Sequence, residues 1–230
     1  MLYDVVYFVK NADENEELRY SLRSLEANFP CGKVWFFGGC PAGLGPDVHV
    51  PVVQDQDSKY LRVRNMLRRA CFNEEITPSF WLFNDDFFIM KRQHNPKPAI
   101  RGTLENRVAQ LEKQFGLPRP YSNRLKATAR VLRSRGCDTL DYELHIPFLV
   151  NRERAQKVLS TFSDDFAFRS IYGNYNYIGG EIRKDVKVFD LEEAPDETMD
   201  FLSTSDVSFR VGIVGEYIRK RFQKKSRWEK

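Results

Sequence analysis

Short hydrophobic segments alternate with amphipathic ones along the first third of the chain, and this alternation constrains the fold more than any other feature. The hydrophobic segments are rich in β-branched and aromatic side chains, which is typical of buried strands. We predict strands over residues 3–9, 33–37, 48–53 and 80–83. Because helical segments separate these strands, we expect an α/β fold with a mostly parallel sheet and helices on both of its faces.

Two helices are predicted between these strands. In the first, Leu18, Leu22 and Leu25 share one face, and Asp13 with Glu16 forms a pattern typical of a helix start. The second helix is predicted over residues 60–72. Its inward side chains are expected to be Leu61, Met66 or Leu67, and Ala70, and its outward ones Arg62, Arg64, Arg68 and Arg69.

Two adjacent carboxylates, Asp85 and Asp86, follow the last of these strands and interrupt a strongly aromatic run. Buried carboxylates are costly unless a cation or several hydrogen-bond donors compensate them. Mg²⁺ and Mn²⁺ prefer carboxylate oxygens, so the pair predicts a metal or catalytic site at the end of a strand. Residues 10–11 and 38–39 also follow predicted strands, and the ligand crevice of such sheets lies at the carboxyl ends of the strands.

Two other residues have settings that indicate chemistry. His145 lies between Leu144 and Ile146-Pro147, where it is either structural, a general base, or a further metal ligand. Arg169 has the guanidinium needed to bind a phosphate through two hydrogen bonds. Neither residue lies in a pattern that specifies its role.

Length and composition favour one domain. The chain has 230 residues, of which 42% are hydrophobic and 13% aromatic, enough for a sizeable core. No apolar run approaches the ~18 residues that a membrane span needs. Charged residues at positions 4 and 10 also make the first residues unlike a signal peptide. The cysteines form no close pairs, which disfavours a structural zinc site. A reduced, cytoplasmic environment is therefore expected. Gly38-Gly39 lacks the spacing of a dinucleotide-binding loop.

Positive charge is concentrated in two regions. Residues 91–140 hold twelve Lys and Arg against three acids, and residues 219–230 hold seven against one. Residues 91–141 are predicted to be a helical insertion, with helices over 104–115 and 123–135, and a last helix is predicted over 212–222. The insertion and the tail are either solvated surfaces or contacts to an anionic partner, such as nucleic acid, an acidic polymer, a membrane surface or donor phosphates.

The sequence resembles the Stealth family in several blocks. Residues 17–26, 34–37 and 80–88 resemble its second block, with an asparagine of that block matched by Asn65. Residues 4–9 resemble its first block. His145-Ile146-Pro147 with Phe168-Arg169 resembles the third, and residues 203–209 around Asp206 resemble the last. Members of this family are sugar-1-phosphate transferases of bacterial capsule synthesis, together with the lysosomal-enzyme GlcNAc-phosphotransferase.

This resemblance implies a GT-A-like fold, a nucleotide-sugar donor (a UDP-sugar) and a hydroxyl acceptor on a glycan or polymer. It implies that Asp85 and Asp86 hold Mn²⁺ or Mg²⁺ and that His145 and Arg169 act at the transferred group. The residues that it implies on the nucleotide-sugar side are Lys10, Asn11, Arg19, Asn65 and Asn84. The insertion is then expected to present the acceptor.

The sequence also departs from the family. The first block usually carries an aspartate where this chain has Lys10, and residues 60–64 replace a Leu-Pro-Thr-Phe run. Glycosyl transfer and sugar-phosphate transfer therefore both stay open. Two alternatives remain: a glycosyltransferase that modifies DNA bases, and a nucleic-acid-binding module that uses the insertion and the tail, without enzymatic activity.

Overall fold

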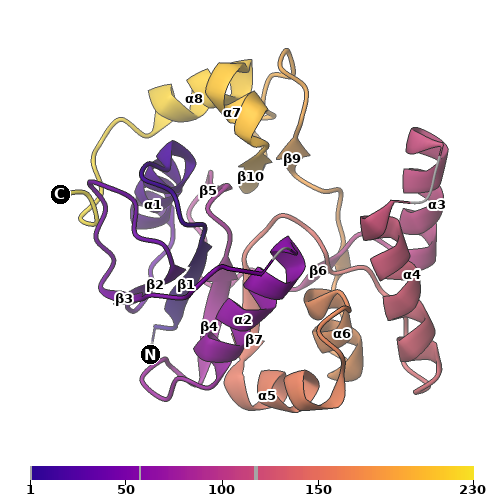
Figure 1. Cartoon of the computed structure of the whole chain (residues 1–230). Coiled ribbons are helices and arrows are strands. Elements are labelled where there is room, and N and C mark those ends of the chain that lie inside the picture. Colours follow the sequence, from indigo (N-terminus) through magenta and orange to yellow (C-terminus); the bar gives the residue numbers. More distant parts are fainter. Residues whose placement is uncertain (1, 57, 117–118) are drawn as a thin grey trace.

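A computed structural model describes residues 2–56, 58–116 and 119–230 (Figure 1). Its centre is a five-stranded sheet in the order β3-β2-β1-β4-β7. The strands are β1 (Asp4–Val9), β2 (Val34–Gly38), β3 (Val48–Val50), β4 (Ser79–Phe83) and β7 (Phe148–Asn151). The first four are parallel, and β7 pairs antiparallel with β4. The predicted mostly parallel sheet with flanking helices is confirmed.

Both faces of this sheet are buried because side chains alternate along each strand. On one face, α1 (Glu16–Asn28) packs against Tyr7 and its neighbours. On the other face, α2 (Lys59–Cys71) and α5 (Arg152–Thr161) share a hydrophobic cluster with Trp35. This double burial explains why the strands are nearly continuous hydrophobic runs in the sequence.

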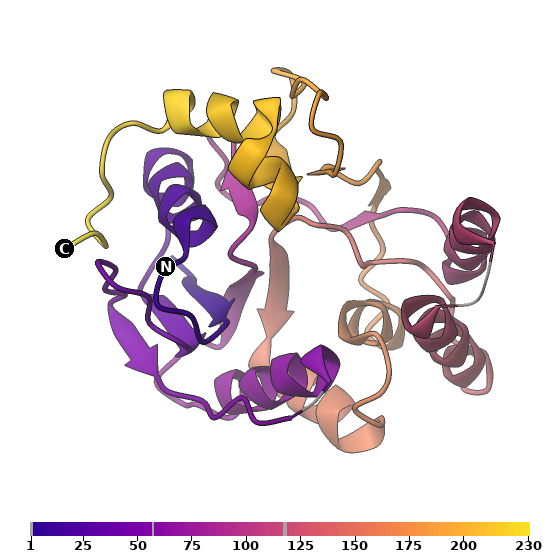
Figure 2. The same ribbon diagram turned by 45° about the horizontal axis from the view of Figure 1, so that its top comes forward.

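A smaller sheet continues from the end of β4. Its order is β5-β10-β9, with β10 antiparallel to β5 and parallel to β9. The strands are β5 (Phe87–Ile89), β9 (Lys187–Val188) and β10 (Phe201–Thr204). Two helices, α7 (Asp206–Val211) and α8 (Ile213–Arg221), cover it next to α1 (Figures 1 and 2). The Asn84-Asp85-Asp86 segment therefore lies at the junction of the two sheets.

The predicted insertion forms a lobe of two helices (Figure 1). The elements of this region and the segments that contact it are β6 (Ala99–Ile100), α3 (Leu104–Phe115), α4 (Pro120–Arg133), α6 (Phe168–Tyr175) and β8 (Glu181–Ile182). The bounds predicted for the first helix are confirmed. The second begins three residues earlier than predicted, because Pro120 suits the first turn of a helix. Both helices share the main hydrophobic cluster through Leu104, Val108, Leu125, Ala129 and Leu132.

The predicted faces of α2 are wrong for two residues. Leu61 is 39% exposed, whereas Arg64 is only 3% exposed. The Arg64 guanidinium donates from Nε to Asp164 Oδ1 at 2.9 Å and lies over the ring of Phe168. Helical periodicity predicted Arg64 to be a surface residue, because the sequence does not show that Asp164 and Phe168 contact it in the fold.

One predicted helix start is wrong, and one predicted helix is confirmed within one residue at each end. The N-cap of α1 is Asn15, not Asp13, and its Oδ1 accepts a hydrogen bond from the backbone N–H of Leu18 at 2.9 Å. The helix predicted over residues 212–222 is α8 (Ile213–Arg221), and it is preceded by α7, which was not predicted and which meets it at Gly212. A Cβ at Gly212 would lie 2.6 Å from the carbonyl oxygen of Ser208, so this close junction requires glycine.

Candidate functional site

Four carboxylates gather where the two sheets meet. Asp85 and Asp86 follow β4, Glu17 lies in the first turn of α1, and Asp206 is the first residue of α7. Asn15 connects α1 to this group, because its Nδ2 donates to Asp85 Oδ2 at 2.8 Å. The carboxyl end of β4 and the amino ends of two helices thus bring residues from distant parts of the sequence together.

These carboxylates repel one another at a half-buried site. Burial raises the pKa of Asp85 to about 6, and the charge of Asp86 adds to this effect. Burial also raises the pKa of Glu17 to about 8, against a hydrogen bond that Thr204 Oγ1 donates at 2.7 Å. Asp85, Asp86 and Asp206 raise the Glu17 pKa further. When all four are ionised, the group therefore carries more negative charge than its surroundings compensate.

We expect Glu17→Gln to make the protein more stable at pH 8. The pKa of Glu17 lies above its ordinary value of 4.5, so unfolding releases a proton between these values and stability falls as the pH rises towards 8. Glutamine mimics the protonated form. In buffer with a chelator, the variant's thermal midpoint should exceed that of the wild type by a few degrees at pH 8 and nearly match it at pH 4.5. Parallel curves for the two proteins across this range would contradict the prediction.

Asp86 is the most deeply placed of the four, at 7% exposure. Its Oδ2 accepts hydrogen bonds from Lys187 Nζ at 2.6 Å and from Ser203 Oγ at 3.1 Å. Its Oδ1 is buried and has no hydrogen-bond partner among the described residues. An unpaired carboxylate oxygen at this depth is costly and indicates that a cation or donor completes the site.

The acids fit a divalent cation that takes part of its coordination from a substrate. Within residues 2–56, 58–116 and 119–230, no three His, Cys, Asp or Glu side chains are placed to hold a metal ion together. Mg²⁺ is usually bound through one or two carboxylates, with phosphate and water oxygens as its other ligands. Asp85 and the free oxygen of Asp86 provide such a pair.

His145 and Asp185 form a second polar group next to the first. His145 Nδ1 lies 2.8 Å from Asp185 Oδ2, and the His145 backbone N–H donates to Asp185 Oδ1 at 2.9 Å. Burial would raise the pKa of Asp185, but the hydrogen bond from His145, with the charge of Arg101, holds it well below its usual range. Arg101 donates to the same carboxylate at 2.8 Å. This contact engages Nδ1 and leaves the second ring nitrogen, Nε2, as the other proton-exchanging position of the imidazole.

Arg169 supports the segment that carries His145. Its Nη1 donates to the carbonyl oxygens of Leu144 at 2.7 Å and Ile146 at 2.9 Å. The guanidinium is buried and lies over the ring of Phe87, one residue after the acidic pair. The structure therefore brings Arg169 to the predicted site, with one nitrogen occupied by the backbone on either side of His145.

Three of the residues expected on the nucleotide-sugar side follow strands at the same edge of the sheet. Lys10 and Asn11 are exposed directly after β1, and Asn84 is half-buried after β4. Gln54, which the sequence did not indicate, donates from Nε2 to the carbonyl oxygen of Val9 at 2.8 Å and to Asn11 Oδ1 at 3.2 Å. Gln54 thereby fixes the turn after β1.

The two others lie on helices. Asn65 is half-buried on α2. Arg19 lies on α1, and its contacts are with the C-terminal segment: its Nε is 3.9 Å from Glu229 Oε2. The structure therefore does not bring Arg19 to the four carboxylates.

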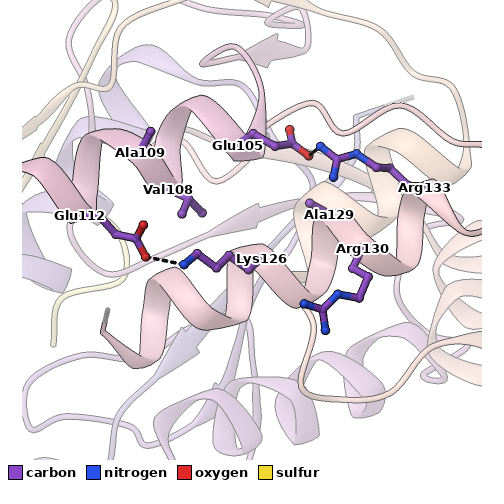
Figure 3. A pocket seen from close by; sticks show the side chains of 8 residues that line it. All are labelled: Glu105, Val108, Ala109, Glu112, Lys126, Ala129, Arg130 and Arg133. Carbon is purple, nitrogen blue, oxygen red and sulfur yellow. Dashed lines mark hydrogen bonds and ion pairs between the residues drawn. The ribbon is translucent and has the colours of Figure 1, made fainter. Parts of the chain in front are cut away.

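One hollow in the structure lies away from all of these residues. It occupies about 320 Å³ between α3 and α4 (Figure 3). Ion pairs between Lys126 and Glu112 and between Arg133 and Glu105 flank it. Another hollow, of about 230 Å³, has Ile146 and Val186 in its lining, the neighbours in sequence of His145 and Asp185. A hollow alone supplies no chemistry, whereas Glu17, Asp85, Asp86 and Asp206, the acidic junction between the two sheets, can hold a cation.

Much of the positive charge in the predicted insertion is already engaged. Several of its cations form ion pairs or lie on aromatic rings, namely Lys97, Arg101, Arg119, Arg124, Lys126, Arg133 and Arg135. Such contacts leave fewer side chains available for an extended polyanion.

Several residues of the C-terminal tail contact the rest of the protein, and others are exposed. Arg219 pairs with Glu16 at 2.8 Å, and Arg221 donates to the carbonyl oxygen of Met90 at 2.8 Å. Phe222 and Trp228 are buried. Lys220, Lys224 and Lys225 remain exposed.

No described helix is long and apolar enough to cross a bilayer. Comparison of the sequence with models of known protein families, and with curated proteins, found no match.

Proposed function

We propose that the protein transfers a glycosyl or glycosyl-phosphate group from a UDP-sugar to a hydroxyl group of a glycan or polymer, in a reaction that depends on Mn²⁺ or Mg²⁺. The observation that carries this proposal is the excess of carboxylates at the junction of the two sheets. It lies at the carboxyl end of a parallel sheet, where such folds bind nucleotides. The resemblance to the Stealth family supports the same substrates.

The strand order is compatible with a GT-A-like fold, which is part of the proposal. The main sheet has four parallel strands and an antiparallel strand beside β4, and a second small sheet follows β4. The acids lie at the carboxyl end of β4, where we infer that the diphosphate would bind. In this arrangement, Lys10 and Asn11 lie next to the nucleotide, and Asn84 lies next to its ribose or the cation. Arg19 is left out, because it contacts the C-terminal segment.

The proposed roles follow from the contacts. Asp85 and Asp86 would hold the cation, which supplies positive charge to the diphosphate when bound. His145 Nε2 would accept the proton of the acceptor hydroxyl, while Asp185 keeps the ring oriented through Nδ1. The hydroxyl oxygen attacks the anomeric carbon, with UDP as leaving group, or the β-phosphorus, with UMP as leaving group. Arg169 would act mainly by positioning the 144–146 segment.

Thermal-shift measurements test this proposal directly. A ligand that binds only the folded protein raises its midpoint by an amount that depends on ligand concentration and affinity. UDP, UDP-sugars and other nucleotide sugars should raise the midpoint in the presence of Mn²⁺. No shift with any nucleotide or nucleotide sugar, with or without Mn²⁺, would contradict the proposal.

The same protein preparation tests the nucleic-acid alternatives. A binding module would bind DNA with an affinity that falls steeply with salt, and it would bind no nucleotide sugar. A DNA-modifying glycosyltransferase would do both. Ion pairs engage several cations of the insertion, which leaves fewer of them for DNA phosphates. This favours a glycan, or a polymer other than DNA, as the acceptor.

A further inference from the structure

Lys187 reaches the acidic junction through the register of the second sheet. In that sheet, Ser203 pairs with Phe87 on one side and with Lys187 on the other. Asp86 directly precedes Phe87, so the three polar side chains lie next to one another across the strands. The result is a Lys187 ammonium 2.6 Å from Asp86 Oδ2. Strand pairing therefore fixes the backbone position of Lys187.

Lys187 differs from the other cations of the protein in its ion pairing with the acidic junction. In the part of the chain that the structure describes, it is the one Lys or Arg that forms an ion pair with any of the four carboxylates, Glu17, Asp85, Asp86 and Asp206. One ammonium does not balance four carboxylates. The ion pair engages Asp86 Oδ2, whereas the buried Oδ1 has no hydrogen-bond partner among the described residues.

The ammonium has hydrogen-bonding capacity left. It carries three N–H donors, and the described residues provide one hydrogen-bond acceptor, Asp86 Oδ2. The Lys187 side chain is 17% exposed, so it is not sealed from solvent. An anion at the junction can therefore accept hydrogen bonds from the remaining donors.

We propose that Lys187 is a built-in cation of the donor site, which binds the diphosphate beside the divalent ion and shares Asp86 with it. This inference rests on the proposed function and specifies which groups of that site bind the negative charge of the diphosphate. A diphosphate needs more than one positive partner, and a lysine supplies a charge that no chelator removes. The protein should consequently bind UDP weakly without any metal. Lys187 and the divalent ion should also compete for Asp86.

Calorimetric titration with UDP and with MnCl₂ tests this inference. Lys187→Met removes the charge and keeps most of the side-chain volume. In EDTA, the variant should bind UDP about 10- to 100-fold more weakly than the wild type, the range expected for a lost hydrogen bond to a charged group. In the absence of nucleotide, it should bind Mn²⁺ more tightly than the wild type, because Asp86 has lost its cation. Lys187→Arg should retain UDP binding in EDTA.

Lys220→Met, an exposed lysine of α8, is the matched control and should behave as the wild type. The inference is overturned if Lys187→Met binds UDP in EDTA as the wild type does, or if the wild type binds UDP only with Mn²⁺. In either case the proposed function survives. If the wild type binds neither UDP nor UDP-sugars under any condition, the proposed function itself fails. Weak UDP binding by both Lys187→Met and Lys187→Arg would show disruption of the sheet and overturn the specific role of the charge.

Discussion

Asp86→Asn should lower the rate of sugar transfer about 10³-fold while the protein stays folded. The change removes a negative charge from the oxygen that we expect to bind the divalent ion, and such an ion contributes several kcal/mol to a charged transition state. Asparagine keeps the shape of the side chain and an oxygen that can accept from Lys187 and Ser203. The measurement is release of UDP or UMP from the nucleotide sugar identified by thermal shift, at saturating Mn²⁺.

Two comparisons make this prediction specific. Asp138→Asn, at an exposed position of the basic segment, should retain wild-type activity. Asp86→Asn should also lose the Mn²⁺-dependent part of UDP binding, because the ion bridges protein and diphosphate. Full activity in Asp86→Asn would exclude the junction as the catalytic site. A large drop of its thermal midpoint would instead assign Asp86 to stability.

His145→Ala should lower kcat about 10²- to 10⁴-fold, the usual contribution of a positioned general base. The KM for the donor should change little, because proton transfer stabilises the transition state and not the bound donor. Asp185 holds the ring through a 2.8 Å contact, so removal of the ring leaves a space next to a carboxylate. Added imidazole should enter this space and restore part of the rate.

Imidazole rescue separates a base from a structural histidine. A purely structural His145 would give a variant with a lower thermal midpoint and no response to imidazole. His94→Gln is the matched control, since His94 is exposed and lies in the loop after β5. Activity within about threefold of the wild type in His145→Ala would remove His145 from the proposed mechanism, because the expected loss is far larger.

The regular elements were largely predictable because their signals are local. Short hydrophobic runs identified the four parallel strands of the main sheet, and leucines spaced by three and four identified α1. The sequence also indicated that Asp85 and Asp86 end a buried strand, and the structure places them there. The error at Arg64 had a different origin, since burial of a guanidinium depends on Asp164, which lies 100 positions away.

The partners of the site were not predictable because they come from remote and weakly patterned segments. Lys187 is 101 positions from Asp86, and Ser203 is 117 positions away. Asp185 lies in an irregular segment just before a two-residue strand, where neither periodicity nor a motif marks it. Asn15 did carry a local signal, the N-cap preference, but Asp13 carried it as well.

Hydrophobic runs and the order of segments along the chain are local properties, and they were enough to predict a parallel sheet with a pair of acids at the end of one strand. How those acids are compensated depends on contacts that form only in the folded protein. Pairing of β5, β10 and β9 places Lys187 and Ser203 on one oxygen of Asp86, and the same packing brings Glu17 and Asp206 close. Electrostatic energies depend on distances between atoms and on burial, and folding sets both across segments that the sequence keeps far apart.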